Sequence, residues 1–288
     1  MANEVVLVAV GCLTGVLAGM LGAGGGFATV ALLLAADVNP HVAVGTALVY
    51  LMIMGGWGTF MHVHLRLVDR QLAIVIGASA AGFALVGAQV AEALESRDLV
   101  LALALFTACV SGISLAWPQT RRPVDLPDED IVEEEEPPQE TPPRFAVRSL
   151  RETLRPAVVP AAAEANPPLG AAAVGGSIIG LLKGLFGVGG AFLIVPVMSR
   201  VGGLRREVAV GSSLFAILVA SLVAAVRHTT LGNVDGSDLL ALVPGGLFGS
   251  FVGARAARSM SPAAVRRVFL VVMLASTVYL VLFRSAYQ

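Results

Sequence analysis

The sequence predicts an all-α polytopic membrane protein made of two inverted structural repeats, and three observations support this fold class. Of the 288 residues, 56% are hydrophobic and only 14% are charged, whereas a soluble domain carries about 25% charged residues. Apolar runs recur that are long enough to cross about 30 Å of hydrocarbon. The two apolar halves also repeat one another, while the charge pattern of their loops is reversed.

Eight apolar segments can be placed, four in each half, and the first segment of each half is interrupted by glycines. They lie at 4–36, 42–64, 71–94, 98–117, 169–199, 208–228, 237–256 and 265–284. We therefore divide the chain into an N-terminal membrane repeat (1–117), a linker (118–168) and a C-terminal membrane repeat (169–288). The linker holds eleven acidic residues and many prolines. Because this composition cannot bury a core, we expect the linker to be flexible.

The second half repeats the glycine and polar positions of the first half. One shift, which changes by a single residue after the glycines, aligns them all. The aligned pairs are Gly15 and Gly180, Gly19 and Gly184, Gly22 and Gly187, Gly24 and Gly189, Gly25 and Gly190, Thr46 and Ser212, His62 and His228, Asp69 and Asp235, and Gly87 and Gly253. Chance similarity between apolar helices does not align polar residues, so we infer an internal duplication. Asp69 and Asp235 are expected to cap the helices that follow them.

Loop charges predict how the halves are oriented, because arginine and lysine stay on the cytoplasmic side. Arginines gather after the second and fourth segments of the first half, but after the first and third segments of the second half. Eight full crossings do not fit this pattern. Two re-entrant first segments, each a pair of half-helices that turns at its glycines, do fit it. The halves then point in opposite directions, with the N-terminus outside and residues 118–168 in the cytoplasm.

This arrangement predicts a multi-pass protein of the cell (inner) membrane, in which each re-entrant segment is followed by three transmembrane helices. The alternative is that the first segment of each half spans the membrane with a kink. The two halves would then be parallel.

The densest glycines, Gly22–Gly26 and Gly187–Gly190, predict unwound backbone and an anion site. Each glycine costs about 1 kcal/mol in a helix interior, so we expect a break and then a new helix start. N–H groups at a helix start bind anions, and irregular backbone at membrane depth is buried in protein or lines a cavity. The alternative is close helix packing. The predicted site residues here are Gly22, Gly24, Gly25, Gly26, Phe27, Gly187, Gly189, Gly190 and Ala191.

Lys183 is the only lysine in the chain and lies in an apolar run, one helical turn before Gly187. A cation in a membrane segment is costly and usually functional. We predict that Lys183 neutralises an anion or gates the site by pairing with a carboxylate. Ala18 occupies the matching position of the first half, which favours a role that is not duplicated. The alternative is that the ammonium group snorkels to an interface.

Other polar residues within the apolar segments are weaker candidates. The hydroxyls of Thr46, Ser212 and Ser213 could donate to the oxygens of an anion, or they could cap helices and link them. His62 and His228 could carry protons for coupling, or they could be interfacial residues with ordinary hydrogen bonds.

These features resemble the TauE/SafE sulfite exporter family, also called the TSUP family of permeases. The resemblance rests on the doubled glycine motif, the Gly-Thr or Gly-Ser start of the next helix, and the histidine before a Gly-x-Val-Asp turn. It covers both apolar halves but not the linker. Leu231–Asp235 fits the turn, whereas Leu65–Asp69 lacks its glycine. The resemblance implies a permease for sulfite, small sulfonates or other organic anions.

The resulting hypothesis is a secondary transporter that exports sulfite, an organosulfonate or a related sulfur oxyanion, bound at half-helix N-termini near the midplane. We find no nucleotide-binding motif, metal-ligand spacing or catalytic pattern, so we expect no enzymatic activity and no cofactor or metal. The expected partners are a small inorganic or organic anion and membrane lipid. We expect no nucleic acid, and a homodimer is left as an alternative to a monomer. An anion channel and an intramembrane enzyme are the alternative functions.

Overall fold

A computed structural model describes residues 4–21, 26–64, 68–116, 169–188 and 206–282. The linker lies outside these ranges. Some side chains within the ranges are also not described, including that of His62. The described residues form nine helices. These are α1 (Glu4–Leu21), α2 (Gly26–Ala35), α3 (Pro40–His64), α4 (Arg70–Ala93), α5 (Ser96–Ala116), α7 (Leu169–Phe186), α9 (Arg206–Thr230), α10 (Gly236–Ser259) and α11 (Pro262–Leu282).

The helices begin and end close to where the sequence predicts. The first segment is broken, since α1 ends at Leu21 and α2 begins at Gly26. The next break follows Phe186, where Gly187 has a φ of 66°, a left-handed conformation that glycine adopts without steric cost. The N–H of Gly187 donates to the carbonyl oxygen of Lys183 at 2.8 Å, which closes the last turn of α7.

Asp69 and Asp235 cap α4 and α10, which confirms the prediction for both residues. Oδ1 of Asp69 accepts the N–H of Leu72 at 2.9 Å. Oδ1 of Asp235 accepts the N–H of Asp238 at 3.2 Å. Each carboxylate thereby satisfies one of the N–H groups that the first turn of a helix leaves free.

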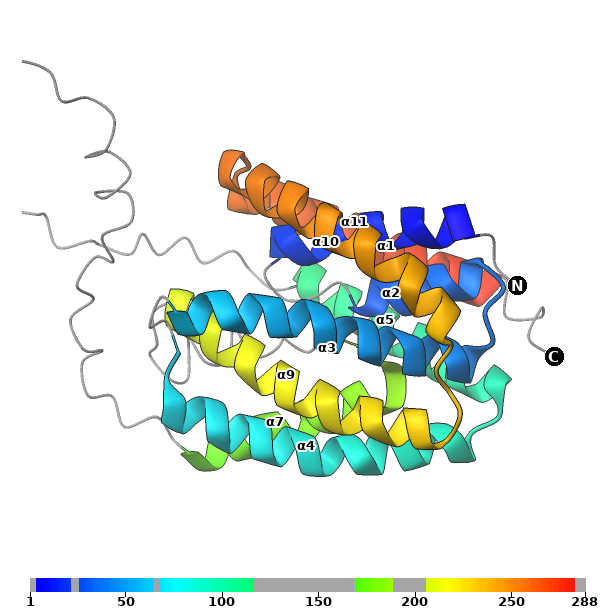
Figure 1. The fold of residues 1–288 in the computed structure, drawn as a ribbon, viewed down its shortest axis with the longest axis horizontal. Coiled ribbons are helices and arrows are strands. Elements are labelled where there is room, and N and C mark those ends of the chain that lie inside the picture. Colours follow the sequence, from blue (N-terminus) through cyan, green and yellow to red (C-terminus); the bar gives the residue numbers. More distant parts are fainter. Residues whose placement is uncertain (1–3, 22–25, 65–67, 117–168, 189–205, 283–288) are drawn as a thin grey trace, which may run out of the picture.

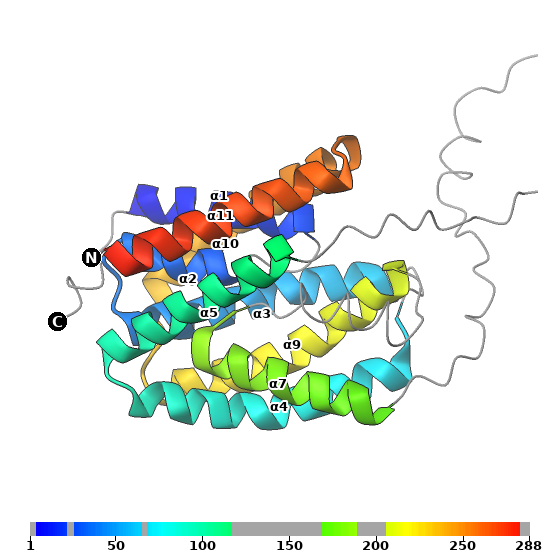
Figure 2. The same ribbon diagram turned by 180° about the vertical axis from the view of Figure 1, so that it is seen from behind.

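The two halves of the chain exchange helices. α1 of the first half packs along α10 of the second half, and α7 of the second half packs along α4 of the first half. α3 and α9 contact each other, and α5 contacts α11. In Figures 1 and 2, α1, α3, α4 and α5 run in the opposite direction to their sequence counterparts α7, α9, α10 and α11. Each half therefore completes the packing of the other.

Glycines bring the exchanged helices into backbone contact, and these contacts recur at equivalent positions. A methyl group added at Gly15 would overlap the carbonyl oxygen of Gly246, and one added at Gly180 would overlap that of Ala80. Ala80 and Gly246 are equivalent positions in the aligned halves. The next aligned glycines, one helical turn farther on, repeat this arrangement. The duplication seen in the sequence thus extends to the contacts between helices.

Two equivalent hydrogen bonds also join the halves. The backbone N–H of Asp235 donates to Oγ1 of Thr46 at 3.1 Å, and that of Asp69 donates to Oγ of Ser212 at 2.8 Å. Both hydroxyl residues are fully buried. Each lies in the second turn of its helix, and α3 and α9 run in opposite directions (Figure 1). The two bonds therefore lie toward opposite ends of the bundle.

The ends of the bundle differ in charge. α1 and α3 both begin at the end where the N-terminus lies in Figure 1, so the broken first segment starts and finishes at that end. α4 begins and α10 finishes at the opposite end. This end, which we call the arginine end, carries the exposed residues Arg70, Arg255 and Arg267.

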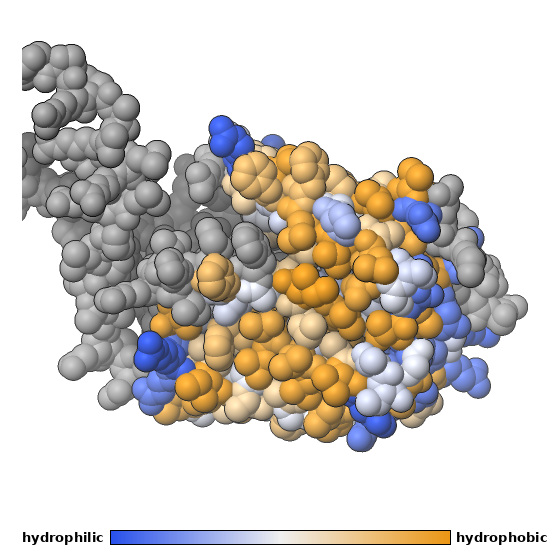
Figure 3. All heavy atoms as spheres, viewed as in Figure 1, coloured by the Kyte–Doolittle hydropathy of each residue, from blue (hydrophilic) through white to orange (hydrophobic). Residues whose placement is uncertain are grey.

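The outer surface is apolar around its middle. By length and composition, four of the described stretches could cross a membrane, and other apolar helices are shorter. The four are Arg70–Ala93, Ser96–Ile113, Gly211–Thr230 and Gly236–Ala256. Figure 3 shows hydrophobic residues over the middle of one face and hydrophilic residues gathered toward its two ends. This distribution is typical of a polytopic membrane protein.

We expect Gly180→Ala to lower the free energy of unfolding by about 1–3 kcal/mol, as overpacked sites do. The new methyl group would meet the backbone of α4. Gly175→Ala in the same helix is the matched control, because a methyl group there meets no described atom within 4 Å. Thermal unfolding in detergent compares the two variants. Equal melting temperatures would show that α4 and α7 do not depend on this contact.

Ser212→Ala and Thr46→Val remove the acceptors of the two bonds that join the halves. We expect each substitution to destabilise the protein by about 1–3 kcal/mol, because it leaves a shielded N–H without a partner. Ser259→Ala is the control, since that exposed hydroxyl donates to a carbonyl of its own helix. If melting temperatures fall no further than in Ser259→Ala, the bonds do not hold the halves together.

Candidate functional site

The short helix α2 places a helix start in the interior of the protein. Its first four residues, Gly26 to Thr29, are buried, and α2 contacts α1, α3 and α11. The ring of Phe27 packs edge-on against Phe269 of α11, with ring centroids 5.4 Å apart. The first turn of α2 is thus enclosed by protein. Three further predicted residues lie outside the described ranges: Gly22, Gly24 and Gly25.

Gly187 places the end of α7 against the first half of the chain. A methyl group added at Gly187 would lie 3.0 Å from the carbonyl oxygen of Val44 in α3 and 3.3 Å from Cγ2 of Val30 in α2. Val30 is one helical turn from Gly26. The second glycine break is therefore next to the short helix that follows the first break. The rest of the second motif lies outside the described ranges: Gly189, Gly190 and Ala191.

Lys183 carries its charge into the interior of the protein. Its side chain is 0% exposed, and its Nζ has no hydrogen-bond partner within the part of the chain that the structure describes. This location disagrees with snorkelling, which requires the ammonium group to reach an aqueous interface. An isolated ammonium group in a nonpolar interior is strongly destabilising. The end of α7 therefore favours a negatively charged group close to Lys183.

The three candidate hydroxyl residues, Thr46, Ser212 and Ser213, are all fully buried. The structure does not bring Thr46 and Ser212 together. Each lies in the second turn of a 25-residue helix, and such a helix is about 36 Å long. Since these two helices run in opposite directions (Figure 1), one small anion does not reach both hydroxyls. Their bonds to the turns before α10 and α4 match the helix-linking alternative.

His228 connects α9 with the end of α7. Its ring is fully buried, and Nε2 lies 3.1 Å from the carbonyl oxygen of Gly184. His228 thus lies in the interior, against the turn that holds Lys183, and not at the surface as an interfacial residue would. The side chain of its counterpart, His62, is among those that the structure does not describe.

A polar cluster around Tyr50 escaped the sequence analysis. Tyr50 is 1% exposed, and its hydroxyl lies 3.1 Å from Oγ1 of Thr14 and donates to the carbonyl oxygen of Gly11 at 3.3 Å. Gly246 leaves room for the ring, because a methyl group there would overlap the tyrosine. The position equivalent to Tyr50 holds Ala216. No repeated polar signal therefore marked Tyr50, and only the asymmetry between the halves could have drawn attention to it.

Comparison with known proteins adds independent information. A sequence model of the family described as "Sulfite exporter TauE/SafE" matches residues 7–280. The "Probable membrane transporter protein YunE" of Bacillus subtilis (strain 168) is 27% identical over 278 residues, which cover 94% of each chain. A "Probable membrane transporter protein" of Xylella fastidiosa (strain 9a5c) is 24% identical over 281 residues, or 96% of this chain and 94% of that one.

No solved structure matches the chain at a significant level. The family match nevertheless includes both apolar halves, with α1, the short helix α2, Lys183 and most of α11. It confirms the family expected from the doubled glycine motif. The chain is therefore a membrane transporter that belongs to the sulfite exporter TauE/SafE family.

Proposed function

We propose that this chain is a secondary transporter that exports a small anion, namely sulfite, an organosulfonate or a related sulfur oxyanion. The observation that carries the proposal is the ammonium group of Lys183, which is fully buried and unpaired among the described residues. A bound oxyanion would supply the missing counter-charge. Unlike a fixed carboxylate, it could also leave, which is what transport requires. The sulfite exporter name of the family supports the choice of sulfur oxyanions.

The start of α2 supplies the second part of the proposed site. A helix start carries about half a positive charge and donates N–H groups, so it favours an anion. The contact of Gly187 with Val30 supports one site shared by the two glycine breaks. Within it we include Gly22, Gly24, Gly25, Gly26, Phe27, Lys183, Gly187, Gly189, Gly190 and Ala191. Thr46 and Ser212 stay outside this site, because their hydroxyls accept the hydrogen bonds that join the halves.

We further propose that the halves are inverted repeats, each with a re-entrant first segment. Support comes from the opposite directions of matching helices and from the shared starting end of α1 and α3. With the arginine end in the cytoplasm, the N-terminus lies outside and the linker inside, in the inner membrane. In such folds the substrate binds near the midplane at broken helices, and the halves rock around it.

Lys183→Met keeps the approximate size of the side chain and removes its charge. We expect this variant to lose more than about tenfold in sulfite exchange, because the anion loses its charged partner. Its melting temperature should stay equal or rise, since a buried unpaired charge is removed. Uptake of labelled sulfite into sulfite-loaded liposomes measures the exchange. Arg255→Met, which removes an exposed charge at the arginine end, is the control.

The same assay separates the competing functions. A carrier shows uptake that saturates with sulfite and accelerates when sulfite is present inside, whereas a channel gives a current without saturation. Chemical conversion of the anion would indicate an enzyme. Exchange kinetics in Lys183→Met that match those of Arg255→Met would remove Lys183 from the anion site.

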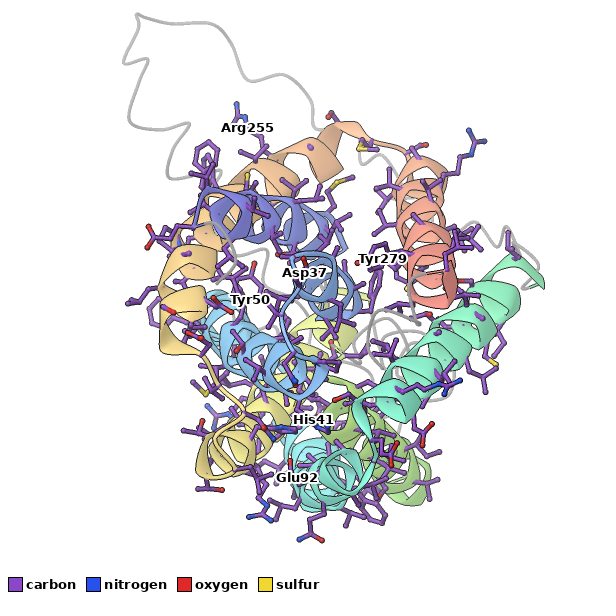
Figure 4. The ribbon with its side chains drawn as sticks, turned by 90° about the vertical axis from the view of Figure 1, so that its right-hand side faces the viewer. Asp37, His41, Tyr50, Glu92, Arg255 and Tyr279 are labelled. Atoms are coloured by element: carbon purple, nitrogen blue, oxygen red, sulfur yellow. The ribbon has the colours of Figure 1, made fainter. Side chains whose placement is uncertain are left out.

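Single cysteines test the proposed orientation. In a variant without Cys12 and Cys109, we expect Arg70→Cys and Arg255→Cys to react with a membrane-impermeant maleimide only from the cytoplasmic side. Asp37→Cys, at the other end of the bundle (Figure 4), should react only from outside. Labelling of positions 70 and 255 from opposite sides would rule out the inverted arrangement.

A further inference from the structure

Three helices bring titratable and charged side chains together at the end of the bundle where α1 and α3 begin. His41 lies in the first turn of α3, Glu92 in the last turn of α4, and Arg227 and His228 in the last turn of α9. Figure 4 looks onto this end, and His41 and Glu92 lie near each other there. None of these residues has a role in the anion site described above.

The hydrogen bond of His228 fixes the form of its ring. Nε2 lies 3.1 Å from the carbonyl oxygen of Gly184, and a carbonyl oxygen only accepts, so Nε2 carries the hydrogen. The neutral ring then has its lone pair on Nδ1. Nδ1 is buried and has no hydrogen-bond partner in the described part of the chain. His228 can therefore take up one proton at Nδ1 and keep its bond to Gly184.

Burial opposes a charge on the ring of His228 most strongly, and charged groups at the same end of the bundle add to its electrostatic environment. Glu92 is exposed, accepts a hydrogen bond from Nδ2 of Asn233 at 2.7 Å, and acts on His228 through its opposite charge. His41 is half-buried, and its Nδ1 also lacks a partner among the described residues. His41 and Arg227 both oppose a positive charge on the ring of His228. The buried ring of His228 and the exposed carboxylate of Glu92 thus lie at the same end of the bundle.

We propose that His228 is a proton-binding site that controls anion affinity from this end of the bundle, an inference that rests on the anion site proposed at Lys183. Gly184, which His228 bonds, directly follows Lys183 in α7. An imidazolium there adds a second positive charge close to the ammonium group. At roughly 10 Å and an effective dielectric constant of about 20, one charge changes the affinity for an anion about tenfold.

Proton uptake from water at Nδ1 strengthens anion binding, and proton loss weakens it. In the proposed orientation this end of the bundle faces outside. External acid then retains the anion at its site and slows export, whereas neutral pH favours release.

His228→Gln tests this role, because its amide nitrogen can still donate to Gly184 but does not titrate. Calorimetry with purified protein measures the affinity for sulfite and for sulfate at about pH 5 and about pH 8. We expect the gain in affinity at the lower pH to be about tenfold larger in the wild type than in His228→Gln. Comparing the two proteins at each pH removes the titration of sulfite itself.

His64→Gln is the matched control, since it makes the same substitution at the arginine end of α3, and it should keep the wild-type pH dependence. An affinity that does not change with pH in the wild type, or a pH dependence in His228→Gln as large as in the wild type, would overturn the proton-binding role and leave the anion site standing. No binding at either pH would reject the anion proposal instead.

Nuclear magnetic resonance of ¹³C-labelled histidine rings tests His228 without any anion. The signal that disappears in His228→Gln should shift as the pH is lowered from about 8 to about 4. A signal that does not move over this range rejects the inference.

Discussion

The exchange of α1 and α7 between the two halves is the constraint on which the rest of this structure depends. Each helix lies along a helix of the other half, close enough that a single methyl group at Gly15 or Gly180 would overlap a backbone carbonyl. Lipid tails are as apolar as the side chains, so association of helices in a membrane relies on such close packing rather than on the hydrophobic effect. The glycines therefore decide which helices become neighbours.

This exchange also positions the candidate site. With α7 held against α4, its last turn reaches α2 and α3, where Gly187 lies beside Val30 and Val44. Lys183, one turn earlier, is enclosed as a consequence. His228 then bonds the same turn from α9. A lysine and a histidine that are far apart in the sequence thus act on one short stretch of backbone.

The sequence predicts the helices well because the signals for them are local. Apolar length, the glycine that ends α7 and the aspartate caps each act within a few residues, and the structure has all three. The position of Lys183 in an apolar run likewise indicated burial. The doubled motif identified the family before any comparison was made.

Other features were out of reach because they depend on which helix faces which. In a membrane helix nearly every face is apolar, so hydrophobic periodicity does not reveal the packed face. The pattern therefore did not show that Thr46 and Ser212 lie toward opposite ends and bond the turns of the other half. Tyr50 was overlooked because Gly246, which leaves space for its ring, lies in a helix almost two hundred residues away.

The interlocked helices have a consequence for how the chain is made. The ribosome completes α1 first, but its partner α10 emerges only after the linker, α7 and α9. The glycine-lined face of α1 therefore has no packing partner until α10 enters the bilayer. Contacts between such distant segments also form slowly, because a long loop has to close. A chain arrested at the linker leaves α1 without α10 and α4 without α7. The packing of this transporter is thus completed only when the last helices have entered the membrane.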